Sequence, residues 1–305
     1  MELIVIALGG NAIAKRNEPL SVENQYQNIH STTKLIAKLA GKYRLVIVHG
    51  NGPQVGLLAL QNAAYSKVPA YPLDILVAQT QGMLGYMIGQ SLQQQPNVTQ
   101  VVTLLTQVEV DKCDPSFTHP TKFIGPVYPP EQQNQLKQQY GWIFKQDGQY
   151  IRRVVPSPKP KKILEIATIQ KLLNDNTIVI CNGGGGIPVI SIDHGYQGVE
   201  AVIDKDLSAA QLAIQLQADH LMILTDADAV YENWGTPQQK ALDHVDTERL
   251  KPLAIDDGSI GPKVKSVIEF VEKTGNTAYI GTLTDIESLL KGQKGTVIKN
   301  HSMDK

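Results

Sequence analysis

Cysteine is almost absent from the sequence, with only Cys113 and Cys181 among 305 residues. Two cysteines cannot form a disulfide framework or a multi-cysteine zinc site, and such low usage is typical of a reducing compartment. Long apolar runs are also missing. The run nearest the start, Leu3 to Leu8, is too short for a signal-peptide core or a membrane span. We therefore expect a globular protein of the cytoplasm that does not enter the membrane.

The sequence also lacks an excess of charge of either sign. Its 28 lysines and arginines and 29 aspartates and glutamates give a formal net charge of −1. This balance argues against a general polyanion binder, so we expect no nucleic-acid partner. Hydrophobic residues make up 42% and charged residues 19%, which excludes disorder as the dominant state. The length fits two ordinary domains or one large α/β unit.

What the sequence does contain is a regular alternation of short apolar runs and longer helical patterns. Apolar strands separated by helices predict a mainly parallel sheet in a layered α/β fold. We expect strands at 3–8, 45–48, 98–105, 177–181, 221–224 and 278–280. We expect helices near 22–42, 53–60, 74–94, 163–173, 207–217 and 262–273.

The alternation stops between residues 111 and 162, where eight of the 17 prolines lie. That density excludes long regular elements. Two short runs, 142–145 and 150–155, flank an Asp147-Gly148 turn, which is a hairpin signal. An ordinary loop of fifty residues would be unusual in a compact domain. We therefore interpret 111–162 as an inserted lid subdomain, called the lid segment below, within a single domain spanning 1–305.

Three of the expected strands end in glycine-rich turns, namely Gly9-Gly10-Asn11, Gly50-Asn51-Gly52 and Gly183–Gly186. Glycine allows backbone N–H groups to approach an anion, and a following helix N-terminus favours negative charge. Tight strand-to-helix turns use glycine for purely structural reasons as well. Three turns at one sheet edge nevertheless favour a phosphate-containing ligand. A P-loop and a strand followed by G-x-G-x-x-G are both absent from the sequence.

Charged residues begin two of the expected helices. Asp206, in the run Asp204-Lys205-Asp206, could cap a helix start while its neighbours are solvated, or Lys205 could face the sheet edge as a phosphate-binding cation. Lys263 follows Gly261-Pro262 in another first turn, where lysine opposes the helix dipole. An anionic ligand would explain that position, solvent exposure is the alternative, and Lys265 is the neighbouring candidate.

Further polar residues leave their roles open. Asp226 and Asp228 follow the expected strand 221–224 and could hold Mg²⁺ or structure the turn through backbone hydrogen bonds. His49 and His194 could act as bases, although single histidines are more often structural. Neither cysteine has the surroundings of an activated nucleophile.

Taken together, the motifs resemble those of the carbamate kinases, in the amino acid kinase superfamily. The resemblance covers nearly the whole chain in the family's order, and its most specific parts are PTK, the four-glycine run and DKD. The matching segments are ALGGN (7–11), HGNGPQVG (49–56), DPSFTHPTKFIGP (114–126), RRVVPSPKP (152–160), NGGGGIPV (182–189), GVEAVIDKDLSAA (198–210), LTDADAVY (224–231) and GPKV (261–264).

The resemblance implies an open α/β/α sandwich around a mainly parallel sheet with a small protruding lid, and a homodimer. It implies reversible phosphoryl transfer between ATP and carbamate, giving ADP and carbamoyl phosphate, with Mg²⁺ accompanying the nucleotide and with use in arginine or purine-derivative breakdown. It also assigns roles. The implied catalytic residues are Lys122, Lys205, Asp206 and Lys263, the substrate and phosphate pocket is Gly9, Gly10, Asn11, Gly50, Asn51 and Gly52, and the nucleotide side is Asp226, Tyr231 and Lys263.

This sequence departs from the family pattern at Phe123, at Tyr150-Ile151 and at Ile260. None of these departures removes a charged group, so we expect effects on lid mobility and rate and not on the reaction. Two alternatives remain: another acyl-phosphate-forming amino acid kinase, and a non-catalytic nucleotide or metabolite sensor on the same fold.

Overall fold

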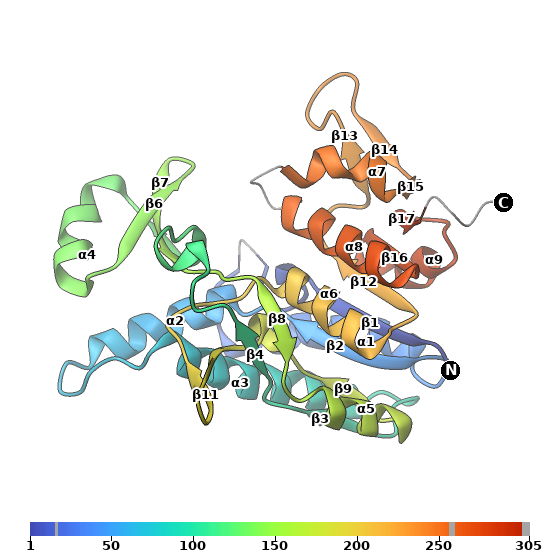
Figure 1. Ribbon diagram of the computed structural model, residues 1–305, viewed down its shortest axis with the longest axis horizontal. Helices are drawn as coiled ribbons and strands as arrows, with labels where there is room; N and C mark the ends of the chain where they lie inside the picture. Colours follow the sequence, from blue (N-terminus) through green and yellow to red (C-terminus); the bar gives the residue numbers. More distant parts are fainter. Residues whose placement is uncertain (16–17, 256–259, 301–305) are drawn as a thin grey trace.

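A computed structural model describes residues 1–15, 18–255 and 260–300, and shows helices on both sides of an eight-stranded sheet (Figure 1). The strand order is β15-β17-β16-β12-β1-β2-β9-β3, and neighbours are parallel except β16 and β17. The expected mainly parallel sheet is therefore confirmed. Its strands are β1 (Leu3–Leu8), β2 (Arg44–His49), β3 (Val101–Thr103), β9 (Ile178–Ile180), β12 (His220–Leu224), β15 (His244–Asp246), β16 (Thr277–Gly281) and β17 (Thr296–Lys299).

The core lies on both faces of this sheet because its central strands are apolar throughout. Every residue of β1 is buried, and alternate side chains enter different hydrophobic clusters. Val5 packs with α5 (Ile166–Asn174), α6 (Lys205–Leu216) and α8 (Gly261–Thr274). Ile6 packs with α1 (Val22–Ile36), α3 (Leu73–Gln93) and α9 (Ile286–Leu290). These two helical layers make the expected three-layer sandwich.

The lid segment leaves this sandwich from a second sheet, with strand order β11-β10-β4-β8. In it β4 (Gln107–Val110) pairs antiparallel with β8 (Pro160–Ile163), which brings the two ends of the segment together. The other two strands, β10 (Ile187–Ile192) and β11 (Gly195–Gly198), form a hairpin. The second sheet is thus the base from which residues 111–159 extend.

Within the lid segment, a three-stranded sheet carries a short helix and protrudes from the body (Figure 1). The sheet comprises β5 (Lys122–Tyr128), β6 (Ile143–Asp147) and β7 (Tyr150–Val155), with α4 (Gln133–Tyr140) between β5 and β6. The expected hairpin at Asp147-Gly148 is confirmed, because Asp147 pairs with Tyr150. Leu136, Phe144 and Ile151 form a small core of their own.

The remaining differences from expectation are short elements. The helix expected at 22–42 ends at Ile36 and continues as a 3₁₀ turn over Ala37–Leu39. The sequence predicts no strand or helix between residues 224 and 262, but that stretch contains β13 (Val230–Glu232), β14 (Lys240–Leu242), β15 and α7 (Thr247–Leu250). Strands of three residues carry too little apolar periodicity to be distinguished from loops. Among the helices that the structure describes, none is long and apolar enough to cross a membrane.

Candidate active site

The glycine turns expected at one sheet edge do meet there. The turn after β9 packs on the turn after β2: a Cβ at Gly183 would lie 2.3 Å from His49 Nε2, and one at Gly184 would lie 2.2 Å from Asn51 Nδ2. Gly184 also has a φ of +65°, which glycine adopts readily. Both positions therefore need glycine for the two turns to touch. Asn51 is buried here, and its amide donates to Thr80 Oγ1 at 2.8 Å.

The first turn joins the same edge from β1. A Cβ at Gly9 would lie 2.8 Å from the carbonyl oxygen of Leu224, at the end of β12. Gly10 and Asn11 follow in a 3₁₀ turn over Gly10–Ala12. Beside them, Gly52 is the first residue of α2 (Gly52–Ala64), so the N-terminus of a 13-residue helix opens at this edge. Such an end presents free N–H groups and a positive dipole to an anion.

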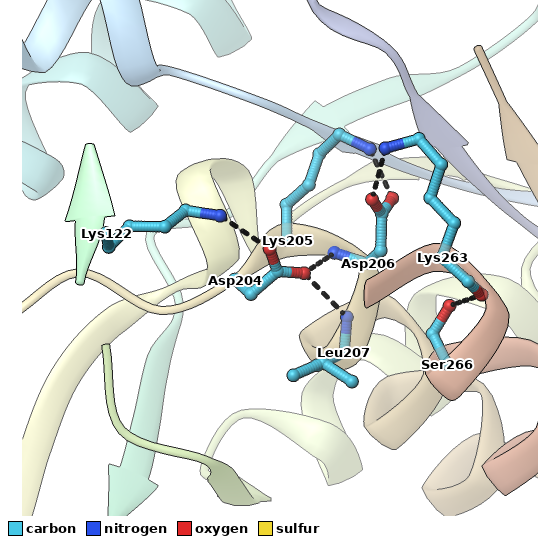
Figure 2. Close-up of polar contacts among 7 residues, drawn as sticks. All are labelled: Lys122, Asp204, Lys205, Asp206, Leu207, Lys263 and Ser266. Carbon is cyan, nitrogen blue, oxygen red and sulfur yellow. Dashed lines mark hydrogen bonds and ion pairs between the residues drawn. The ribbon is translucent and has the colours of Figure 1, made fainter. Parts of the chain in front are cut away.

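Two lysines share the carboxylate of Asp206. Lys263 Nζ lies 3.0 Å from Asp206 Oδ2, and Lys205 Nζ bonds the other oxygen. The ammonium groups consequently lie side by side at one carboxylate (Figure 2). The stem of Lys205 passes the second turn, because a Cβ at Gly50 would lie 3.5 Å from its Cδ. The structure therefore brings these three charged residues to the edge formed by the glycine turns.

Burial and charge act against each other in this cluster. Burial lowers the pKa of Lys205, although Asp206 favours its charged form. Burial also opposes ionisation of Asp206, but the two ammonium groups outweigh it and hold its pKa well below the usual range. The pKa of Lys263 is raised because Asp206 more than offsets the effect of burial. An ionised Asp206 between two lysines leaves one net positive charge in a partly dehydrated place.

Asp204 has a different partner and a different position from those expected. It is the N-cap of α6, accepting from the backbone N–H groups of Asp206 at 2.9 Å and Leu207 at 3.1 Å. The capping role considered for Asp206 is therefore wrong. Its Oδ2 lies 2.6 Å from Nζ of Lys122, the first residue of β5 (Figure 2). Lys122 thus reaches the body of the protein at the α6 N-terminus, next to the Lys205–Asp206–Lys263 cluster.

The residues expected on the nucleotide side lie beyond β12. Asp226 is close enough to Lys263 to help raise the pKa of that lysine. Tyr231 lies on β13, where its hydroxyl donates to Asp228 Oδ1 at 2.8 Å and its ring meets Trp234 edge-on. Asp228 thus bonds a tyrosine side chain, which is neither the backbone hydrogen bonding nor the Mg²⁺ binding considered for it. These contacts tie Asp226 to the lysine cluster, and Tyr231 to the β13–β14 hairpin.

The two histidines differ in position. His194 is exposed in the turn between β10 and β11. His49 is buried, its Nδ1 lies 2.9 Å from the Gly50 carbonyl oxygen, and burial lowers its pKa to about 4. At neutral pH His49 is uncharged and packs beneath two glycine turns. Thr80 has no motif that connects it with the site, and the DKD motif does not indicate that Asp204 pairs with Lys122, because both contacts join residues that are distant in the chain.

This arrangement suits the binding of phosphate groups more than covalent catalysis. A net positive, mostly buried cluster lies beside backbone N–H groups at glycine turns and a helix N-terminus. Such groups stabilise the charge that is spread over a transferring phosphoryl group. The Cys181 thiol is buried with a raised pKa, so it is a poor nucleophile.

Comparison with known proteins supports the same conclusion. The amino acid kinase family matches residues 2–282. Carbamate kinase of Escherichia coli (strain K12) is 57% identical over 298 residues, covering 98% of this chain and 99% of that protein. Carbamate kinase from Giardia lamblia bound to citric acid is 38% identical, with a TM-score of 0.91 and 98% coverage of both chains. The Giardia lamblia enzyme bound to AMP-PNP, also 38% identical, has a TM-score of 0.88 and the same coverage.

These identities extend over almost the entire chain and agree with the resemblance of its motifs. The chain belongs to the carbamate kinase branch of the amino acid kinase family.

Proposed function

We propose that this protein transfers a phosphoryl group reversibly between ATP and carbamate, giving ADP and carbamoyl phosphate. The observation that carries the proposal is the Asp206 carboxylate bonded by both Lys205 and Lys263 at the edge where three glycine turns meet. The full-length relatives named carbamate kinase support the choice of substrate.

The reaction needs little covalent help from the protein. An oxygen of carbamate bonds to the γ-phosphorus while the bond to the β,γ-bridging oxygen breaks, and that electron pair leaves with ADP. Carbamate is already an anion, so no side chain has to remove a proton. What the protein must do is hold two anions together and neutralise charge on the transferring group.

The site residues divide this work. We assign charge neutralisation to Lys205 and Lys263, with Asp206 holding their ammonium groups in place. The pocket for carbamate and the transferred phosphoryl group comprises Gly9, Gly10, Asn11, Gly50, Asn51 and Gly52. The nucleotide side comprises Asp226, Tyr231 and again Lys263, with Asp226 supported by its electrostatic effect on that lysine.

We further propose that the lid segment, residues 111–162, acts as a lid that carries Lys122 to the carbamate side. The outer part of its three-stranded sheet has a small core of its own, which supports movement as a unit about the contact that Ile124 and Val155 make with α2 and α3. A lid that excludes water would limit the loss of labile carbamoyl phosphate during turnover.

Mg²⁺ is expected to enter with the nucleotide. Within residues 1–15, 18–255 and 260–300 there is no group of three or more histidine, cysteine or carboxylate side chains able to hold a metal ion. Asp206 is engaged by two lysines and Asp204 by Lys122, while Asp226 lies near Lys263. This donor set fits an ion held mainly by phosphate oxygens and water, as Mg²⁺ usually is. When bound, it would neutralise charge on the phosphates.

The biological setting belongs to the same proposal. We propose that the enzyme works in the cytoplasm as a homodimer and makes ATP at the end of arginine or purine-derivative breakdown. The two free cysteines fit a reducing compartment and support that location.

The direct test is ATP formation from ADP and carbamoyl phosphate, followed with purified protein and Mg²⁺. We expect turnover with carbamoyl phosphate and at most slow turnover with acetyl phosphate. Faster turnover with another acyl phosphate would favour a different amino acid kinase. Tight ADP binding without turnover of any acyl phosphate would favour the alternative of a non-catalytic nucleotide or metabolite sensor.

A further inference from the structure

Asp204 joins two parts of the molecule that are 82 residues apart in the chain. Its Oδ1 accepts two backbone N–H groups at the start of α6, which fixes the carboxylate on the body. Its Oδ2 is left for the ammonium group of Lys122, 2.6 Å away on β5 of the lid segment. The side chain of Asp204 is only 12% exposed, whereas that of Lys122 is 39% exposed. A fixed, nearly buried acceptor therefore holds a more accessible donor.

The same lysine has a second use under the proposed function, as the lid residue that binds the small anionic substrate. One ammonium group cannot form a full ion pair with a carboxylate and with an incoming phosphate at the same time. Ion pairs at this degree of exposure typically change an equilibrium constant by only about twofold to fivefold. An anion with more negative charge, at a site with further positive groups, can therefore displace the carboxylate.

We infer that Asp204 is a positioning residue that holds Lys122 in the substrate-free enzyme and releases it to the phosphate of carbamoyl phosphate. The inference rests on the proposed function. The carboxylate keeps the lysine close to its working position and at the same time competes with the substrate for it. Asp204 itself touches neither substrate.

The obvious competing explanation is a general electrostatic one. Asp204 also favours the charged forms of Lys205 and Lys263, so it acts on the whole cluster. Removing its charge would then strengthen anion binding whether or not Lys122 is present. The two explanations differ in one respect: only competition for Lys122 makes the effect disappear when Lys122 is removed.

One substitution removes the charge of Asp204 and keeps its hydrogen bonds to the start of α6. Asparagine caps helices about as well as aspartate, so Asp204→Asn keeps the α6 start and removes the carboxylate. Asp111→Asn is a matched control. One oxygen of Asp111 accepts the backbone N–H of Cys113 at 2.9 Å, and the other lies 3.6 Å from Lys161 Nζ, so it too combines a turn with a lysine pair.

The experiment measures KM for carbamoyl phosphate at saturating ADP in wild type, Asp204→Asn, Lys122→Ala, the double variant and Asp111→Asn. We expect Asp204→Asn to lower KM about twofold to fivefold, and Lys122→Ala to raise it. The double variant should match Lys122→Ala within about 1.5-fold, and Asp111→Asn should match wild type. Circular dichroism checks that every variant is folded.

Three results would overturn the inference. An equal drop in KM in both backgrounds would show a general field effect. A rise in KM in folded Asp204→Asn would show that Asp204 assists the bound substrate and does not compete for Lys122. Unchanged KM would show that the pair has no part in binding. If wild type makes no ATP from carbamoyl phosphate, the proposed function itself has failed, which is a distinguishable outcome.

Discussion

Gly125 occupies the space in which Gly56 would carry a side chain. A Cβ at Gly56 would lie 2.0 Å from the Gly125 Cα and 2.3 Å from its backbone nitrogen. Gly56 belongs to α2, whose first residue Gly52 opens at the proposed pocket, and Gly125 belongs to β5, which begins at Lys122. Backbone contact at these two glycines therefore sets how close β5, which carries Lys122, lies to the pocket.

Replacing Gly56 with alanine should move the lid away from α2. A backbone atom at 2.0 Å cannot rotate aside, so β5 must shift. We expect a rise of at least fivefold in KM for carbamoyl phosphate, while ADP affinity stays within about threefold, or roughly 0.65 kcal/mol. Steady-state kinetics and calorimetry give the two values. Gly82→Ala on α3 is the control, since nothing lies within 4 Å of its added methyl group. Unchanged KM in Gly56→Ala would contradict the positional role.

Lys122→Ala should separate the two substrates in a similar way. The lysine lies at the lid side, 2.6 Å from Asp204, and under our proposal it serves the small anion. We expect a higher KM for carbamoyl phosphate and a lower kcat, with calorimetric ADP affinity within about threefold of wild type. Equal weakening of both ligands would instead place Lys122 at the phosphate position that the two share.

His49 should make stability depend on pH between about 6.5 and 4. Burial lowers the pKa of His49 to about 4, from 6.5 for the unfolded chain. As pH falls, the unfolded state therefore takes up the proton first. The stability contributed by neutral His49 is complete above pH 6.5 and is lost progressively down to pH 4, by about 3 kcal/mol in all.

Urea unfolding between pH 4 and pH 8 tests this expectation. His49→Gln should flatten the dependence between pH 6.5 and 4, even if the variant is less stable overall. Asp206 does not interfere, because its pKa is lowered from the ordinary 3.8 and its contribution is lost only at still lower pH. An identical slope in wild type and His49→Gln would show that another group is responsible.

Asp206→Asn should destabilise the fold as well as slow the reaction. Its carboxylate is 4% exposed and is the shared partner of Lys205 and Lys263, so its loss leaves two ammonium groups facing each other. Breaking a buried pair from one side costs about 3–5 kcal/mol. Lys205→Met should cost less, because the Lys263–Asp206 pair survives. The comparison is made by urea unfolding at pH 7, and equal costs would argue against a shared carboxylate.

The parallel sheet could be predicted from the sequence because its central strands are apolar on both faces. Leu3–Leu8 and the strand beginning at His220 needed no knowledge of tertiary contacts. The short β13 and β15, by contrast, contain Glu232 and Asp246 and are strands only because a neighbour pairs with them. Local pattern carries no information about such pairing.

The candidate site was predictable where its residues directly follow a predicted strand. The glycine turns could be identified from local sequence alone, whereas the choice of Lys263 over Lys265 needed the family resemblance. The Lys122–Asp204 contact could not, because it depends on how the lid segment is folded onto α6. The cap considered for Asp206 is made by Asp204 instead, a shift of two residues that lies within the usual uncertainty of a helix start.

We propose that the phosphoryl group is transferred at the lysine pair held by Asp206. Transfer there is tested by kcat for ATP formation in Lys205→Met and Lys263→Met, together with urea unfolding of the same proteins. Lys265→Met is the matched control, being an exposed lysine two residues further along α8. We predict that either site variant lowers kcat by about 10²–10³, as loss of a positioned donor does. The free energy of unfolding should change by much less than the activation free energy that this drop in kcat represents. Near-normal kcat in folded Lys205→Met, or an equal loss in Lys265→Met, would show that transfer does not depend on this lysine pair.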